Sequence, residues 1–143
     1  MDNTLKETLK KVRFIAESIL KKNFEPLKDL EIPKKQGIYI IKETSNRFFK
    51  NRIFYIGKST NLYNRIIRHT PSRNNNAGRS GSILRKKLHK RGLSYNEISD
   101  YLKNECLFCV QDIKDYDNTA LVEDLLIAVL RRKGEPIIND IKT

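Results

Sequence analysis

The sequence has few of the features that anchor a protein in a membrane or export it. No apolar run approaches the roughly 20 residues that a membrane-spanning helix needs, and the first residues, MDNTLKETLKK, lack the apolar core of a secretory signal. The 143 residues, 38% of them hydrophobic, are enough for about one domain with a core. These features predict a cytoplasmic protein with no membrane partner.

Cysteine and histidine are also scarce. The two cysteines, Cys106 and Cys109, stand in CLFC, and the two histidines, His69 and His89, lack the spacing of a zinc finger. The surrounding stretch ECLFCVQDI is rich in strand formers, and positions three apart on a strand point to opposite faces. We therefore expect two separate core thiols rather than a redox pair or half of a zinc site.

Negative charge is the minority charge of this chain. Lys and Arg total 29 against 17 Asp and Glu, which gives a net charge of +12. A surplus of this size repels itself unless a polyanion neutralises it. No basic amphipathic stretch with a broad apolar face is present, so nucleic acid is favoured over an anionic membrane surface. A solvated basic surface is the alternative.

Periodicity and turn residues predict an α+β fold with three strands. Residues 4–22 read as a helix with a capping box at Thr4 and Glu7, either covering the sheet or forming a dimerisation or DNA-contacting arm. Two β-branched runs around a polar turn predict a hairpin at 37–43 and 53–57. Further helices are expected at 59–70, 82–91, 94–102 and 118–134, the third of them with a capping box at Ser94 and Glu97. A third strand is expected at 105–113. We divide the chain into an N-terminal helical arm, 1–30, and one compact unit, 31–143.

Arg65 and His69 are four residues apart on a predicted helix, so they share one face with Cβ atoms about 6 Å apart. Beside a hairpin that carries Tyr39 and Tyr55, they would form a pocket with a fixed cation, an imidazole and two phenols. Such a pocket suits a phosphodiester, because arginine grips phosphate oxygens bidentately and neutralises charge that builds in the transition state. An exposed basic helix face is the alternative.

Glu123 lies within a strongly apolar predicted helix, ALVEDLLIAVL. Burying its carboxylate costs several kcal/mol unless a cation or hydrogen-bond donors satisfy it. A salt bridge would do this, and so would a metal ion. A single carboxylate with substrate phosphate and waters is a familiar environment for Mg²⁺. The neighbouring Asp124 is the rival carboxylate, although it could reach Arg131 and stay at the surface.

Five elements in this order resemble the GIY-YIG nuclease superfamily: Gly37-Ile38-Tyr39, Tyr55-Ile56-Gly57, Arg65-x3-His69, Glu123 and Pro136-x2-Asn139. The resemblance covers roughly residues 35–140. It implies a small three-stranded antiparallel sheet flanked by helices, here with an added N-terminal helix. It also implies metal-dependent cleavage of a phosphodiester bond, usually in DNA, with Mg²⁺ as the cofactor and Mn²⁺ as its expected substitute.

The resemblance assigns the central roles of the site. Tyr39 matches the general base that acts on the attacking water, and Tyr55 matches the tyrosine that contacts the scissile phosphate or a water. Arg65 matches the phosphate clamp, and Glu123 matches the lone metal ligand. We expect Arg65, Lys42 and a metal-held water to lower the pKa of Tyr39 by favouring the phenolate.

Three further catalytic positions follow from the same resemblance. His69 matches a proton acceptor or hydrogen-bond partner of the first tyrosine. Asn139 matches an asparagine that supports the site. Lys42 matches a lysine that some members carry three residues after the first tyrosine, and a surface lysine on an edge strand is its alternative reading.

The stretch between Tyr39 and Tyr55 is somewhat long for this family, so its turn, TSNRFFKNR, is expected to project. With Phe48, Phe49 and three basic residues, the turn would either touch nucleic acid or pack against the first helix.

The densest positive charge follows the helix that carries Arg65. We expect the loop 72–80 and the helix 82–91 to contact phosphates, which positions a duplex without reading its sequence. A solvated helix is the alternative. The predicted nucleic-acid-binding residues are Lys58, Arg73, Arg79, Arg85, Lys86, Lys87, Lys90 and Arg91.

The leading hypothesis is a Mg²⁺-dependent DNA endonuclease. A catalytically inactive nucleic-acid-binding module and an RNA-cleaving nuclease are the alternatives. No helix-turn-helix or zinc finger is apparent, so the protein would be weakly specific, structure-selective, specific as a homodimer, or dependent on a protein partner.

Overall fold

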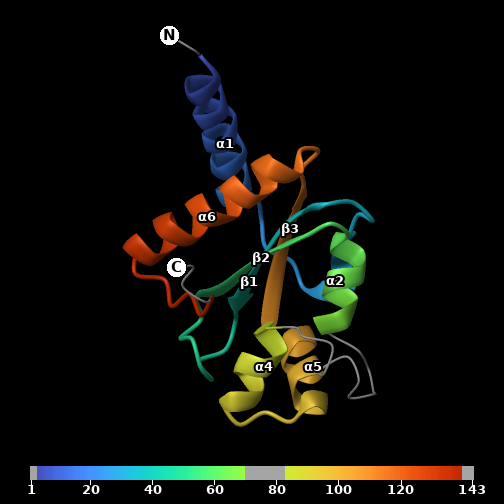
Figure 1. Ribbon diagram of the computed structural model, residues 1–143. Helices are drawn as coiled ribbons and strands as arrows, with labels where there is room; N and C mark the ends of the chain where they lie inside the picture. The colour runs from blue at the N-terminus through green and yellow to red at the C-terminus, as the bar shows by residue number, and fades with distance from the viewer. Residues whose placement is uncertain (1–2, 70–82, 140–143) are drawn as a thin grey trace.

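The chain is built around one three-stranded antiparallel sheet, as the computed structural model of the protein shows (Figure 1). The structure describes residues 3–69 and 83–139. In chain order its elements are α1 (Thr4–Leu20), η1 (Leu27–Asp29), β1 (Gly37–Glu43), β2 (Ile53–Ser59), α2 (Leu62–His69), α4 (Ile83–Lys90), α5 (Tyr95–Asn104), β3 (Cys106–Asp112) and α6 (Tyr116–Arg132). The predicted α+β fold, with a small antiparallel sheet flanked by helices and an N-terminal helix, is confirmed.

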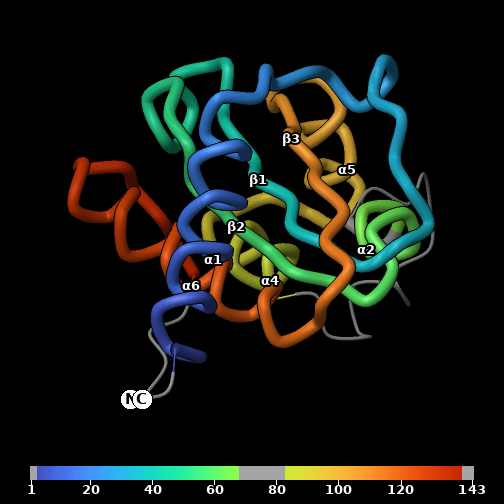
Figure 2. Tube along the Cα trace, turned by 90° about the horizontal axis from the view of Figure 1, so that it is seen from above, coloured from blue at the N-terminus to red at the C-terminus, as the bar shows by residue number. Residues whose placement is uncertain are grey.

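Strand β1 lies in the middle of the sheet, between β2 and β3 (Figure 2). The register places Tyr39 opposite Gly57 of β2 and opposite Val110 of β3. All residues of β1 are buried except Lys42, which is half-buried. A strand covered on both faces needs apolar side chains at nearly every position, which explains the run of β-branched residues in GIYIIKE.

Alternate side chains of β1 enter two separate hydrophobic clusters. Tyr39 and Ile41 face a cluster that α2, α4 and α5 complete. Ile38 and Ile40 face the other cluster, which α1 and α6 complete. Figure 1 shows these two groups of helices lying apart, with the strands between them. The sheet therefore separates the molecule into two helical layers.

The two cysteines lie on opposite faces of β3. Cys106 is buried in the cluster with Tyr39, whereas Cys109 is buried in the cluster with Ile38. Both are free thiols. The expectation of two diverging core thiols is confirmed.

The turn between β1 and β2 folds back onto the core. The carboxylate of Glu43, fully buried, accepts hydrogen bonds from Phe48 N at 3.0 Å, Phe49 N at 2.8 Å and Tyr101 Oη at 2.5 Å. Phe49 stacks on Phe54 with ring centroids 4.2 Å apart. The alternative of packing against the first helix is wrong, because a buried carboxylate ties the turn to α5 instead.

Helix boundaries follow local signals where a side-chain cap is present. The predicted capping box of Ser94 and Glu97 is formed at the start of α5. The capping box predicted at Thr4 and Glu7 is not formed, because Asn3 is the N-cap of α1 and Thr4 already lies within the helix. Gly134 follows α6 with a φ of 89°, a conformation that favours glycine.

Helix α1 joins the body of the protein through its C-terminal half. Val12, Ala16 and Ile19 are buried in the same cluster as residues of α6, whereas Leu5 and Leu9 are exposed. Within the part of the chain that the structure describes, no helix combines the length and the apolar character that crossing a membrane requires.

Candidate active site

The side chain of Tyr39 packs directly over Gly57 of the neighbouring strand. A Cβ built on Gly57 would be 2.1 Å from Cζ of Tyr39 and 2.3 Å from its Oη. The Tyr39 ring therefore occupies the space that any larger residue at position 57 would need. The ring is only 2% exposed, and its hydroxyl lies over β2 rather than over its own strand.

Tyr55 accompanies Tyr39 on the same face of the sheet. Their ring centroids are 6.1 Å apart, and Tyr55 is 8% exposed. On neighbouring antiparallel strands, residues 39 and 55 are diagonal neighbours, close enough for aromatic side chains to touch. The hairpin thus brings two phenols together from positions 16 residues apart in the sequence.

Burial and several neighbouring side chains influence the pKa of Tyr39. Burial, the strongest influence, and the electrostatic effect of Tyr55 raise this pKa well above its ordinary value, while the charge of Arg65 acts to lower it. A hydrogen bond with Tyr55 and the charge of Glu123 raise it further. The two phenols, the guanidinium and the carboxylate thus share one electrostatic environment.

The expectation that its surroundings lower the pKa of Tyr39 is wrong for the protein alone. Arg65 acts in the expected direction, but burial outweighs it because an ionised phenol loses its hydration in the core. Lys42 is not among the causes of the shift.

Helix α2 presents Arg65 to this environment. Its first turn is capped by Asn61, whose Oδ1 accepts a hydrogen bond from Asn64 N at 3.1 Å. Leu62 and Ile66 are fully buried and anchor the helix, which leaves Arg65 half-buried, with its charge acting on Tyr39. His69 is the last residue of α2, but its side chain lies outside the described part of the structure.

Helix α6 contributes Glu123 from the opposite layer of the molecule. The residue is 6% exposed, and Val122 and Leu126 beside it are fully buried. The adjacent Asp124 is exposed. Position rather than residue type therefore separates the two carboxylates, and the one that acts electrostatically on Tyr39 is Glu123.

Asn139 lies against the middle residue of the second motif. Its Oδ1 accepts a hydrogen bond from Ile56 N at 3.1 Å, and its Nδ2 donates to Ile56 O at 2.5 Å. The side-chain amide therefore pairs with β2 as a neighbouring strand would. Asn139 contacts the backbone between Tyr55 and Gly57.

The donor set fits a hard cation that keeps most of its waters. In the described ranges, no three His, Cys, Asp or Glu side chains gather in a way that could hold a metal ion. A closed structural zinc site needs four such ligands, so these residues do not provide one. Mg²⁺ is commonly held by one or two carboxylates together with substrate phosphates and water, and the buried carboxylate of Glu123, whose charge acts on Tyr39, is consistent with that arrangement.

Lys42 is not brought to the tyrosines. It lies three residues after Tyr39 on one strand and therefore points to the opposite face of the sheet. Its Nζ lies 6.0 Å from the ring centroid of Phe24, in the layer that α1 and α6 form. The catalytic role expected for Lys42 has no support in this placement.

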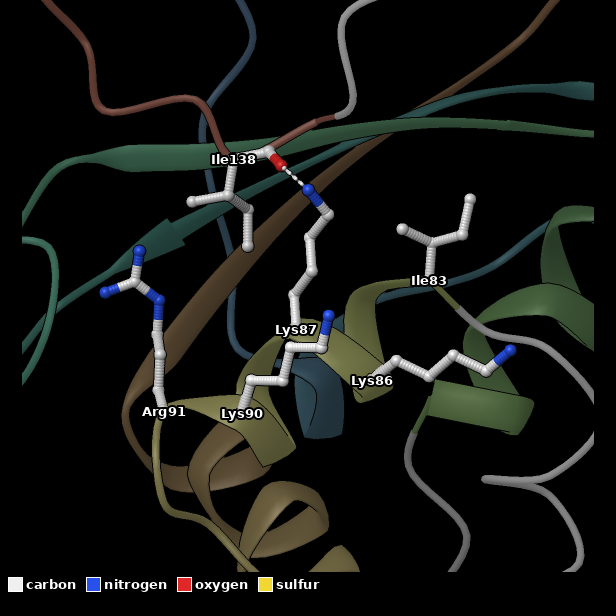
Figure 3. Close-up of a pocket in the computed structure, with 6 residues that line it drawn as sticks. All are labelled: Ile83, Lys86, Lys87, Lys90, Arg91 and Ile138. Carbon is white, nitrogen blue, oxygen red and sulfur yellow. Dashed lines mark hydrogen bonds between the residues drawn. The ribbon is translucent and has the colours of Figure 1, made fainter.

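Helix α4 lines a groove of about 610 Å³ next to β2 (Figure 3). The groove is lined by Ile83, Lys86, Lys87, Lys90, Arg91 and Ile138. Lys86, Lys90 and Arg91 are exposed, whereas Lys87 is half-buried and its Nζ donates to Ile138 O at 2.5 Å. Four predicted nucleic-acid-binding residues thus line one cavity.

Arg85 does not belong to this basic surface. It is 1% exposed, and its guanidinium donates to Ser99 Oγ at 3.3 Å and to Tyr95 O at 3.1 Å. Its carbon Cζ lies 5.4 Å from the Tyr95 ring centroid. The apolar periodicity of α4 turns position 85 inward, so the phosphate contact expected of Arg85 has no support here.

The remaining predicted basic residues lie elsewhere. Lys58 follows Gly57 on β2, and its Nζ lies 5.7 Å from the ring centroid of Tyr116 at the start of α6. Arg73 and Arg79, with the loop 72–80, lie outside the described residues.

Two contributions to the site were not anticipated from the sequence. One is the steric requirement for Gly57, which only the contact with Tyr39 reveals. The other is the wall that Ile138 adds to the α4 groove. The only sequence signal for the second was the place of Ile138 inside Pro136-x2-Asn139.

Comparison with known protein families gives a match over most of the chain. A family model described as the GIY-YIG catalytic domain matches residues 35–135. Searches of curated proteins and of solved structures found no significant match. Because the matched family model covers well over half of the chain and both motif tyrosines lie together at one site, the chain belongs to the GIY-YIG superfamily and carries a nuclease domain of that type.

Proposed function

We propose that this protein is a Mg²⁺-dependent endonuclease that hydrolyses phosphodiester bonds in DNA. The observation that carries the proposal is that Tyr39 and Tyr55 lie on one face of the sheet with ring centroids 6.1 Å apart, where the charges of Arg65 and Glu123 act on Tyr39. Residues from two strands and two helices, far apart in the sequence, thereby influence one hydroxyl. Two phenols, one guanidinium and one carboxylate suit a phosphate ester better than a neutral substrate.

Each residue has a role that its position supports. Arg65, fixed on a short helix and half-buried, clamps the phosphate and neutralises charge that develops in the transition state. Tyr55 lines the same face and orients the phosphate or a water beside it. Asn139 keeps β2 in place through its two bonds to Ile56.

Tyr39 is the proposed acceptor of the proton from the attacking water. In the protein alone its pKa is raised, first by burial, so the neutral phenol is a poor base. Substrate binding must therefore be accompanied by positive charge near the hydroxyl, since an adjacent cation favours the phenolate. Glu123 is the residue that would hold Mg²⁺ at this point. The ion would supply charge stabilisation to the phosphate and to the leaving oxygen.

The α4 groove is the proposed phosphate-backbone contact. Lys86, Lys90 and Arg91 are exposed along it, and ionic contacts of this kind hold a duplex without reading bases. Specificity would then come from a homodimer or a protein partner, or it would be low.

The proposal is tested with purified protein, Mg²⁺ and four substrates: supercoiled plasmid, duplex oligonucleotides, branched DNA and RNA. We expect cleavage of DNA that EDTA abolishes and that Mn²⁺ restores. Cleavage of RNA alone would favour the RNA-cleaving alternative. Binding without cleavage of any substrate would favour the inactive binding module.

The residue assignment is tested with Glu123→Gln and Tyr39→Phe. Each should reduce the cleavage rate by about 10²–10⁴-fold, the range typical of a lost catalytic group, while DNA binding persists in a mobility-shift assay. Asp124→Asn, an exposed neighbour on the same helix, is the matched control and should cut normally. Full activity of Glu123→Gln in Mg²⁺ would refute the metal assignment.

A further inference from the structure

The outer edge of β2 is covered by two residues that follow α6. Ile138 N donates to Phe54 O at 2.9 Å. Asn139 pairs through its side chain with both backbone groups of Ile56. The backbone groups of an edge strand otherwise remain unpaired. Ile138 and Asn139 therefore behave as a short extra strand that contacts β2 on either side of Tyr55.

Cations from two helices hold this pair of residues. Lys87 of α4 donates to Ile138 O at 2.5 Å, and Arg131 of α6 donates to Asn139 O at 2.5 Å. Hydrogen bonds from charged donors are shorter and stronger than neutral ones. In Figure 3, Lys87 reaches toward Ile138, whereas Lys86 extends away from it.

Lys87 therefore belongs to two features at once. It lines the α4 groove together with Lys86, Lys90 and Arg91, and it holds the strand-like pair against β2. An ammonium group has three N–H donors, so a bond to Ile138 is compatible with a contact to a phosphate oxygen.

We propose that Lys87 is a positioning residue of the cleavage reaction, which links a phosphate in the α4 groove to the strand of Tyr55 through Ile138 and Asn139. The inference rests on the proposed function for the identity of what fills the groove. The basic residues of α4 would then have two different roles. Lys86 and Lys90 hold substrate, whereas Lys87 also keeps the catalytic strand in register.

The kinetic test compares Lys87→Met with the matched variant Lys90→Met in the full chain. Lys87→Met should lower kcat by about 10–10²-fold, because small displacements of a catalytic group have large effects, and it should also raise KM, because a phosphate contact is lost. Lys90→Met should raise KM and leave kcat in place, since it removes binding shared by substrate and transition state. Lys87→Arg should retain most of the wild-type kcat, because a guanidinium can donate a hydrogen bond to the same carbonyl of Ile138.

A second readout needs no nucleic acid. Hydrogen exchange should become faster at the amides of Ile56 and Ile138 in Lys87→Met, because these amides donate to Asn139 and Phe54 in the strand-like pairing. Exchange at both amides should be unchanged in Lys90→Met and in Lys103→Met, an exposed lysine of α5.

The two possible failures are distinguishable. If Lys87→Met raises only KM and leaves amide exchange unchanged, Lys87 is an ordinary phosphate contact and the inference is overturned. If the wild-type protein cleaves no nucleic acid, the proposed function fails. The exchange experiment still decides whether Lys87 holds the residues that cover β2.

Discussion

Gly57 shows how a single residue without a side chain can shape the proposed catalytic site. The Tyr39 ring fills the volume where a Cβ would stand, at 2.1 Å from the ring carbon Cζ. This contact directs the Tyr39 hydroxyl across β2, where Arg65 and Glu123 act on it. A glycine is required here because of a close approach, and it occupies an ordinary strand position.

Gly57→Ala should therefore displace Tyr39. Introducing a methyl group into a filled core costs about 1–3 kcal/mol of stability, and a displaced catalytic group lowers activity by about 10²-fold for each ångström or so. Urea unfolding and single-turnover cleavage would measure the two effects.

The cause can be checked with a double-mutant cycle. In a Tyr39→Ala background, the added Gly57→Ala change should cost much less stability, because the ring it would strike is gone. An equal cost in both backgrounds would show that the glycine is needed for another reason.

At the scale of elements, the proposed function assigns chemistry to β2 and substrate binding to α4. Strand β2 carries Tyr55 and is paired on one side with β1 and on the other with Ile138 and Asn139. Helix α4 buries Leu84 and Leu88 and turns lysines toward the groove. Apolar residues at helical spacing thus set which basic residues face out, and they leave Arg85 facing in.

Binding through α4 should depend steeply on salt. Each phosphate contact releases bound counterions, so replacing Lys86 and Lys90 with glutamine together should reduce the slope of log K against log[salt] by about two. Fluorescence anisotropy with a labelled duplex in EDTA, over a range of NaCl concentrations, would measure the slope.

The matched control is Lys6→Gln with Lys10→Gln, which removes the same net charge from exposed positions of α1. We expect these changes to leave the slope nearly unchanged. An equal reduction in both double variants would mean that α4 is not the contact surface.

At the scale of the whole molecule, the site joins two helical layers that the sheet separates. Tyr39 and Tyr55 belong to the layer of α2, α4 and α5, whereas Glu123 comes from α6 in the other layer.

Folding buries two tyrosine phenols in their protonated form. Burial is the strongest influence raising the pKa of Tyr39 and of Tyr101, above the ordinary value for both.

This burial should make the folded protein sensitive to alkali. Below about pH 10 the phenols are neutral in both states, but above it the unfolded chain ionises while the folded chain does not. The burial of these phenols therefore leaves the free energy of unfolding unchanged below about pH 10 and decreases it as the pH rises above that value. Tyr39→Phe should reduce the steepness of this loss by about 1.4 kcal/mol per pH unit, as measured by urea unfolding between pH 10 and 11.5.

Tyr101→Phe should act in the same direction, since its phenol is also buried. Ile41→Val is the control, because it removes core volume without removing a titrating group. It should lower stability by a similar amount at every pH. If Tyr39→Phe behaves like Ile41→Val, the Tyr39 phenol ionises in the folded protein.

The sequence was sufficient to predict elements whose signals are local. The run GIYIIKE predicted β1 with its observed bounds, and Ser94 with Glu97 predicted the start of α5. The turn between β1 and β2 could not be placed, because its conformation depends on Glu43, Tyr101 and Phe54. The charge of Arg85 favoured a surface position, but its place next to Leu84 on α4 puts it on the buried face of the helix.

The sequence by itself determined the family, the order of strands and helices and the residue types that a phosphodiesterase site requires, because these depend on local pattern and motif spacing. Only the tertiary structure decided which of those residues meet. Strand alternation sends Lys42 away from Tyr39, burial raises the pKa of Tyr39 against the pull of Arg65, and Lys87 reaches the backbone beside Asn139. Each of these results depends on which side chains share a face of the sheet and on how far water is excluded from them. Both are determined by contacts between residues that are distant in the sequence.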